Sequence, residues 1–170
     1  MTHFYEPRLG HPFKHDPFNA IVGPRPIGWI SSQSADGILN LAPYSFFNAF
    51  SSNPPILIFS SNRRVSNNTT KDTLKNVEDT GEVVINVVSH RIVRQMALCS
   101  VEYPASVNEF EKAGFTPLAS DLVKPMRVAE APVQLECKVI DIKDFGEGGG
   151  SGKLIMAQVL KMHIKKSVLG

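Results

Sequence analysis

The stretch VQLECKVIDI, residues 133–142, is followed by the glycine-rich GEGGGSG of residues 146–152 and then by LIMAQVLKMHIK, residues 154–165. From 133 to 139 the odd-numbered residues are apolar and the even-numbered ones polar, which is typical of a half-buried strand. At Ile140 the apolar positions change parity, which indicates a β-bulge there. The stretch therefore predicts two long antiparallel strands joined by a flexible hairpin loop.

Short apolar segments typical of strands precede this hairpin, at 27–33, 39–45, 56–59 and 82–88. Apolar residues at the spacing of a helix occur in fewer segments, at 69–80, 91–100 and 108–113. Thr70 or Asp72 is available to cap the first of these helices, and Gly81 stands where a helix of this kind ends. Because strands outnumber helices and do not alternate with them, the sequence predicts a mostly β fold with peripheral helices, a small antiparallel barrel.

The bulk composition fits one globular domain, which we place at 21–170 after an N-terminal arm at 1–20. The chain has 170 residues, 42% hydrophobic and 20% charged, with a formal net charge of +2. That balance gives no general electrostatic reason to expect a nucleic acid or an anionic membrane as partner. The N-terminus has no signal-peptide pattern and no apolar run approaches the roughly 20 residues of a membrane span, so we expect a cytoplasmic protein.

Several common kinds of site have no support in the sequence. There is no nucleophile elbow, Rossmann GxGxxG motif or P-loop. Cys99 and Cys137 match no metal-ligand spacing and are expected to be buried thiols. His11 and His15 have the spacing of a metal-binding pair but lie in a segment without helical character, so we expect no metal site.

Four segments rich in hydroxyl, amide and basic side chains stand out: 24–32, 40–48, 60–64 and 71–73. A phosphate ester is bound by N–H groups at a helix N-terminus, by hydroxyl donors and by fixed cations. A flat aromatic ring system is bound by apolar side chains and by backbone donors and acceptors at its edge. The alternative is that these segments are ordinary turn residues and an aromatic core, which would explain each one separately.

In this order and spacing, RPIGWISS (25–32), APYSFFN (42–48), KDT (71–73) and TGE (80–82) resemble the flavin reductase-like, FMN-binding split-barrel family. The resemblance extends over most of the chain, from about residue 21 to residue 164. It implies a six-stranded antiparallel Greek-key split barrel that forms a homodimer. It also implies that FMN lies in a groove near the subunit interface.

The resemblance implies eleven residues that bind FMN: Ser31, Ser32, Ser45, Phe46, Phe47, Asn48, Ser60, Arg63, Lys71, Asp72 and Thr73. The first two would lie near the phosphate or ribityl chain, and 45–48 would contact the isoalloxazine ring, largely through backbone groups. Ser60 and Arg63 would line the ribityl-phosphate side, and 71–73 would close over the phosphate. Asp72 is expected to cap its helix so that nearby N–H groups and Lys71 point at the ligand.

Two aromatic side chains outside this set have open roles. Trp29 is as consistent with packing in the core as with touching the ligand. His163 falls on the polar face of the last strand, where it could approach the flavin or the interface, but we expect it at the surface.

The resemblance implies an NAD(P)H:FMN oxidoreductase, with NADH or NADPH as co-substrate. Reduced flavin would pass to a monooxygenase, or electrons to another acceptor. Because flavin supplies the redox chemistry, no catalytic acid or base is expected. The alternative is a non-enzymatic, flavoredoxin-like electron-transfer protein; an enzyme like pyridoxamine-phosphate oxidase is less favoured, since KDT at 71–73 resembles the flavin reductase branch.

Overall fold

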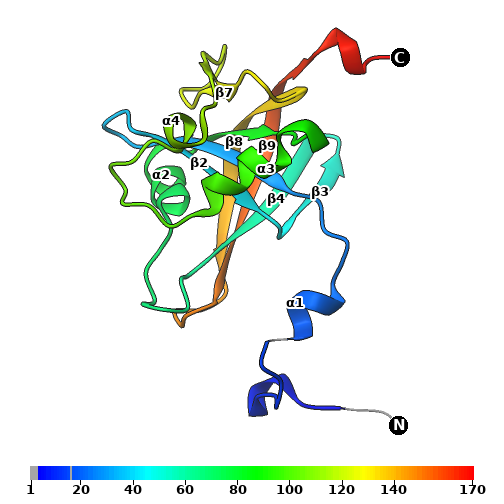
Figure 1. Ribbon diagram of the computed structural model, residues 1–170, viewed down its shortest axis with the longest axis vertical. Helices are drawn as coiled ribbons and strands as arrows, with labels where there is room; N and C mark the ends of the chain where they lie inside the picture. Colours follow the sequence, from blue (N-terminus) through cyan, green and yellow to red (C-terminus); the bar gives the residue numbers. More distant parts are fainter. Residues whose placement is uncertain (1–3, 16) are drawn as a thin grey trace.

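Seven strands form one antiparallel sheet in the computed structural model, which describes residues 4–15 and 17–170. Their order is β2-β1-β5-β8-β9-β4-β3 (Figure 1). The strands are β1 (Gly28–Gln33), β2 (Leu39–Tyr44), β3 (Phe47–Ser52), β4 (Pro55–Asn62), β5 (Glu82–Asn86), β8 (Val133–Asp144) and β9 (Gly152–Ile164). A separate two-stranded sheet consists of β6 (Pro117–Leu118) and β7 (Arg127–Val128).

The long hairpin of β8 and β9 confirms the pattern in 133–165. The two strands pair from Val133 with Ile164 to Asp144 with Lys153, and the glycine-rich segment forms the loop between them. A register shift between Val139 and Asp141 is the bulge that the change of parity predicts.

The predicted number of six strands is wrong, because the chain from 39 to 52 forms two strands at opposite edges of the sheet. Only Ser45 and Phe46 separate β2 from β3. At this bend the Ser60 backbone N–H donates to the Phe46 carbonyl at 2.9 Å. The bend therefore brings the two edges of the sheet together, as in a barrel.

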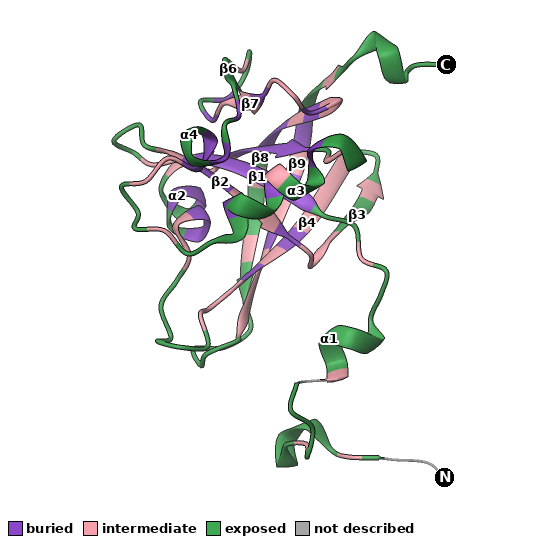
Figure 2. Ribbon diagram, in the orientation of Figure 1, coloured by how far each residue is buried: buried purple, intermediate pink, exposed green. Residues whose placement is uncertain are grey.

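Two apolar clusters lie on either side of β1, because successive residues of a strand point to opposite faces (Figure 2). Ile30 packs in the first cluster with Phe59 from β4, and Trp29 in the second with Phe110 and Phe115. Trp29 is 0% exposed, and its ring centroid lies 4.6 Å from that of Phe115 in an edge-to-face arrangement. Trp29 is therefore a core residue.

Helices cover the sheet at several places: α2 (Asp72–Thr80), η2 (His90–Ile92), α3 (Val93–Met96), η3 (Ala97–Ser100) and α4 (Glu109–Ala113). Helix α2 ends at Gly81, whose φ of +67° confirms the predicted left-handed cap. Its N-cap is Lys71, so the prediction that Thr70 or Asp72 fills this position is wrong. The single helix predicted at 91–100 is three short turns, η2, α3 and η3.

The segments at the two ends of the chain lie outside the sheet. Figure 1 shows η1 (Pro7–Leu9) and α1 (Pro17–Ile21) extending away from the body, and η4 (Lys166–Val168) beyond the end of β9. The division into an arm at 1–20 and a domain at 21–170 stays a prediction. Within 4–15 and 17–170, no helix is long and apolar enough to cross a membrane.

Glu136, on β8, is 0% exposed and ties the 119–126 loop to the sheet. Its carboxylate accepts from the backbone N–H of Asp121 at 2.9 Å and of Leu122 at 2.6 Å, and His163 Nε2 lies 2.5 Å from it. His163 is therefore a partly buried partner of Glu136 and not the surface residue that the sequence predicts. Asp121, Glu136 and His163 offer metal-ligating atoms within 4.8 Å of one another, but the Glu136 oxygens already have these partners and Asp121 pairs with Lys161 at 2.5 Å.

Acid should destabilise the fold through Glu136. Burial alone raises the pKa of this carboxyl, but the two N–H groups and His163 together hold the pKa below its ordinary value of 4.5. The stabilisation is therefore present above the unfolded pKa and is lost as pH falls through the folded pKa. We expect Glu136→Gln to lower the thermal unfolding midpoint at about pH 6. The difference in midpoint between the variant and the wild type should become smaller as the pH is lowered toward about 4. Glu147→Gln in the exposed hairpin loop is the control. A difference in midpoint between Glu136→Gln and the wild type that does not depend on pH would contradict this account.

Candidate functional site

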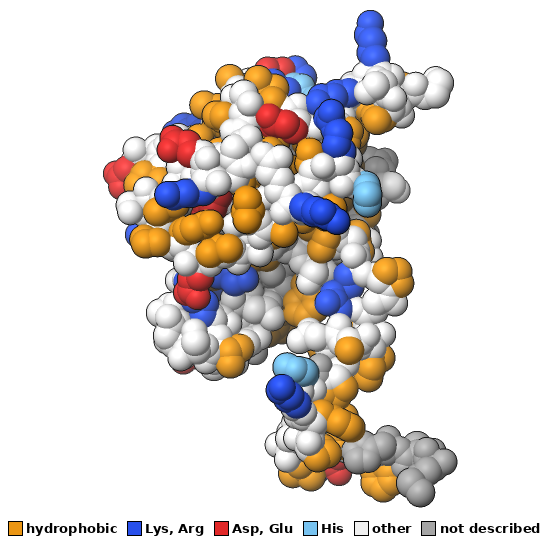
Figure 3. Space-filling view, in the orientation of Figure 1, with side chains coloured by type: hydrophobic (Ala, Val, Ile, Leu, Met, Phe, Trp, Pro, Cys, Tyr) orange, Lys and Arg blue, Asp and Glu red, His pale blue; other side chains and the backbone are white. Residues whose placement is uncertain are grey.

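Two cavities meet at Lys71, where the end of β2 faces the start of α2. One, of about 270 Å³, extends toward Arg64, the 99–103 segment and Glu109. The other, of about 280 Å³, extends toward the bend after β2 and toward the N-terminal segment. Pro43, Tyr44 and Lys71 line both cavities. Figure 3 shows the surface hollowed across its middle, with basic side chains at the edges of the hollow.

Lys71 is a half-buried cation with no ion-pair partner in the described part of the chain. Its Nζ lies 5.1 Å from the centroid of the Tyr44 ring. Among the ion pairs of residues 4–15 and 17–170, none involves Lys71. Burial lowers its pKa, the nearby Arg64 guanidinium lowers it further, and Glu102 partly opposes both. An anion in the cavity would therefore be attracted to this side chain.

The first turn of α2 adds N–H donors beside Lys71. The first N–H groups of an α-helix have no intrahelical partner, and they form the positive end of the helix dipole. Asp72 and Thr73, the first two residues of α2, line the first cavity. A phosphate group is bound by this combination of N–H groups and one fixed cation.

Arg64 lines the same cavity but is already paired. Its guanidinium lies 3.7 Å from an Asp72 carboxylate oxygen and 2.5 Å from a Glu102 carboxylate oxygen. It also donates to the carbonyl of Thr70. Asp72 therefore pairs with Arg64 at the start of α2 and does not serve as the helix cap that the sequence predicts.

Arg63 points elsewhere: its Nε donates to the Asn68 side chain at 2.8 Å, and its side chain lines neither cavity as the described residues form them. The glycine-rich loop between β8 and β9 forms backbone hydrogen bonds with Arg63. Arg63 N donates to Ser151 O at 2.9 Å, and Gly150 N donates to Arg63 O at 3.1 Å. A Cβ on Gly149 would lie 3.2 Å from Val65 Cα, so this approach favours glycine.

The second cavity is lined by four of the predicted residues, Lys71 together with Ser45, Phe46 and Ser60. Ser60 Oγ donates to Asn62 Oδ1 at 2.8 Å, and a Cβ on Gly152 would lie 2.6 Å from Ser60 Oγ. The glycine at 152 therefore leaves room for Ser60 to face the cavity.

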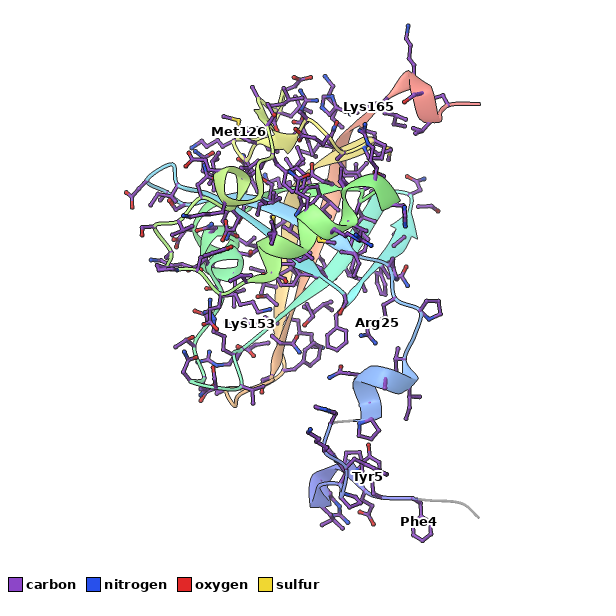
Figure 4. The ribbon with its side chains drawn as sticks, viewed as in Figure 1. Phe4, Tyr5, Arg25, Met126, Lys153 and Lys165 are labelled. Carbon is purple, nitrogen blue, oxygen red and sulfur yellow. The ribbon has the colours of Figure 1, made fainter. Side chains whose placement is uncertain are left out.

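Arg25 also lines the second cavity, and the sequence did not single it out as a ligand residue although it belongs to RPIGWISS. Its guanidinium lies 5.4 Å from the centroid of the Phe46 ring. It donates to the carbonyl of Asn19 at 2.6 Å and to that of Val22. Arg25 thus joins the N-terminal segment to the cavity, where that segment reaches the body (Figure 4).

Phe47 and Asn48 lie away from both cavities. Phe47 covers Gly28, where a Cβ would lie 2.6 Å from the Phe47 ring, and lines a separate apolar cavity of about 480 Å³ with Ile27 and Met96. Asn48 Oδ1 accepts from the Ala49 N–H at 2.9 Å.

Ser31 and Ser32 are 0% exposed and line none of the three cavities as the described residues form them. Ser32 instead takes part in a buried hydrogen-bond network that ends at Thr73 on α2. We therefore leave both serines out of the proposed ligand contacts.

Comparison with solved structures finds close matches to the whole fold. A 2-nitrobenzoate 2-nitroreductase of Pseudomonas fluorescens is 30% identical, with a TM-score of 0.84 over 98% of this chain and 78% of its own. The nitrilotriacetate monooxygenase component B of Bacillus cereus is 25% identical, with a TM-score of 0.85 over 100% of this chain and 86% of its own.

Sequence comparison agrees. An uncharacterized protein of Aquifex aeolicus is 53% identical over 119 residues, 70% of this chain and 60% of that protein, so the match spans less than two thirds of this relative. The model of the flavin reductase like domain matches residues 23–170. The chain belongs to the flavin reductase-like domain family.

Proposed function

We propose that this protein binds FMN and transfers hydride to it from NADH or NADPH. Reduced flavin, or its electrons, would then pass to an acceptor. The observation that carries the proposal is Lys71, a half-buried cation without a carboxylate partner among the described residues, at the N-terminus of α2 and between two cavities. Family membership supports a flavin-related redox role.

The donor set fits a flavin mononucleotide. Lys71 and the first N–H groups of α2 would bind the phosphate. The bend at Ser45 and Phe46 would supply backbone groups and an aromatic side chain to the ring system. The proposed contacts are Ser45, Phe46, Ser60, Lys71, Asp72 and Thr73, with Arg25, Asn62 and Arg64 added from the geometry.

When bound, FMN would supply the redox chemistry, accepting hydride and passing electrons on. The residues of the chain would bind and orient the cofactor and hold the second substrate against it. Burial raises the pKa of Cys99 to about 12, so this cavity-lining thiol stays protonated near neutral pH. It is therefore not assigned a nucleophilic role.

A monooxygenase is one acceptor that we propose, supported by the likeness to the Bacillus cereus component B of nitrilotriacetate monooxygenase.

We also propose a homodimer. Apolar side chains are exposed on β9, where Met162 is 52% and Ile164 44% exposed, and on β3, where Phe50 is 68% exposed. Light scattering after gel filtration should give twice the mass of one chain, and a monomer at micromolar concentration would refute this part.

The test of the redox proposal is the visible spectrum of the protein loaded with FMN, followed without oxygen during addition of NADH and then NADPH. Rapid bleaching of the flavin band by either nucleotide would support the reductase and identify the donor. A bound flavin that stays oxidised with both nucleotides would favour the flavoredoxin-like electron-transfer alternative. Failure to bind FMN would refute both.

A further inference from the structure

A buried chain of hydrogen bonds links α4 to the first turn of α2. Glu109, on α4 and 7% exposed, accepts from Asn40 Nδ2 at 3.1 Å through one oxygen. Its other oxygen accepts from the backbone N–H of Leu41 at 3.0 Å. Asn40 Oδ1 in turn accepts from the Thr73 hydroxyl at 2.7 Å. Asn40 is therefore the residue that links Glu109 to α2 through hydrogen bonds.

A second branch reaches the next turn of the same helix. Ser32 Oγ donates to Asn40 Oδ1 at 3.2 Å and accepts from Asn76 Nδ2 at 3.1 Å. Ser32 is 0%, Thr73 1% and Asn76 6% exposed, so these bonds are shielded from water. The network therefore holds α2 against β1 and β2 through Thr73 and Asn76.

Glu109 determines which end of the Asn40 side chain faces α2. Both Glu109 oxygens accept hydrogen bonds, one of them from Asn40 Nδ2, so the Asn40 amino group points toward Glu109. The Asn40 carbonyl oxygen is then left for the Thr73 and Ser32 hydroxyls. Burial raises the pKa of Glu109, and the N–H groups of Leu41 and Asn40 oppose that rise by stabilising the charged form.

The start of α2 depends on this network because Lys71, its N-cap residue, makes no side-chain capping bond within the described part of the chain. Glu109, Asn40 and Thr73 line the same cavity as Lys71. We propose that Glu109, acting through Asn40 and Thr73, is a positioning residue that sets the place of Lys71 and the α2 N-terminus relative to the flavin phosphate. This inference rests on the proposed function.

The experiment compares binding of FMN and of riboflavin, which lacks the phosphate, by fluorescence titration of Glu109→Gln. Glutamine keeps the shape but replaces one acceptor oxygen by a donor, so the donors of Leu41 and Asn40 are no longer both satisfied as they are now. We expect the Kd for FMN to rise about tenfold and that for riboflavin to stay within about twofold. Glu111→Gln, on the exposed side of the same helix, should change neither.

Thr73→Val and Thr73→Ser provide an independent pair should Glu109→Gln fail to fold. Valine replaces the hydroxyl that bonds Asn40 by a methyl group of similar size and should give the same FMN-selective loss, whereas serine keeps the hydroxyl and should bind FMN as the wild type does. Equal losses for FMN and riboflavin, or no loss, would overturn the positioning role. Equal affinity of the wild-type protein for FMN and riboflavin would instead refute the phosphate site, and this inference with it.

Discussion

Lys71→Ala is expected to raise the Kd for FMN about 10- to 100-fold while leaving the fold intact. The lysine is half-buried and unpaired by any carboxylate of the described residues, so its charge is available to a bound phosphate. A hydrogen bond to a charged group contributes about 1.5–3 kcal/mol, which corresponds to this range of Kd. The side chain packs over the Tyr44 ring at the cavity wall and not in either apolar cluster, so stability should change little.

Lys75→Ala is the matched control, because Lys75 lies one turn further along α2 and is exposed. Fluorescence titration with FMN and with riboflavin separates a phosphate contact from a general loss of binding. A Kd for FMN that is unchanged by Lys71→Ala would remove Lys71 from the site. The phosphate would then have to bind at another of the basic groups around the cavities.

The strands that the sequence predicts well are those with clear apolar periodicity. The hairpin of β8 and β9 and its bulge follow from alternation alone. Strand β3 was missed because a bulge between Ala49 and Ser51 breaks the period, and Phe50 is left exposed at the edge of the sheet. In the 91–100 segment the buried residues are Ile92, Met96 and Cys99, and the chain forms three short turns where the sequence predicts a single helix.

The sequence does not give the direction of every side chain in the predicted site. Thr73 lines one cavity and Phe46 and Ser60 line the other. Lys71 lines both, so the cavities bring together segments that are far apart in the chain. A motif on a strand does not say which face is covered, and packing of α2 against β1 buries Ser32.

The sequence likewise does not show which of two adjacent basic residues faces a cavity. Arg63 and Arg64 follow β4 directly, and only the conformation of the loop turns Arg64 toward the cavity and Arg63 toward Asn68. The shift of the N-cap by one residue to Lys71 likewise turns Asp72 from a cap into a partner of Arg64. Such differences depend on tertiary contacts that no local pattern contains.

Trp29→Ala should lower the free energy of unfolding by about 3–5 kcal/mol, the usual cost of removing a buried aromatic side chain. Trp29 is 0% exposed and packs between Phe115 and the other residues of the second cluster, so alanine would leave a large cavity. Urea denaturation followed by circular dichroism measures the change. Phe145→Ala, which removes an aromatic side chain that is 63% exposed, is the control and should cost far less.

Trp29→Phe decides between the two roles that the sequence left open for this residue. Phenylalanine keeps an aromatic ring beside Phe115, so most of the stability should remain. If Trp29 acts only in the core, the Kd for FMN should stay within about twofold of wild type in a protein that is still folded. A stable Trp29→Phe variant with strongly weakened FMN binding would contradict the assignment, because Trp29 is 0% exposed and lines neither cavity at Lys71 as the described residues form them.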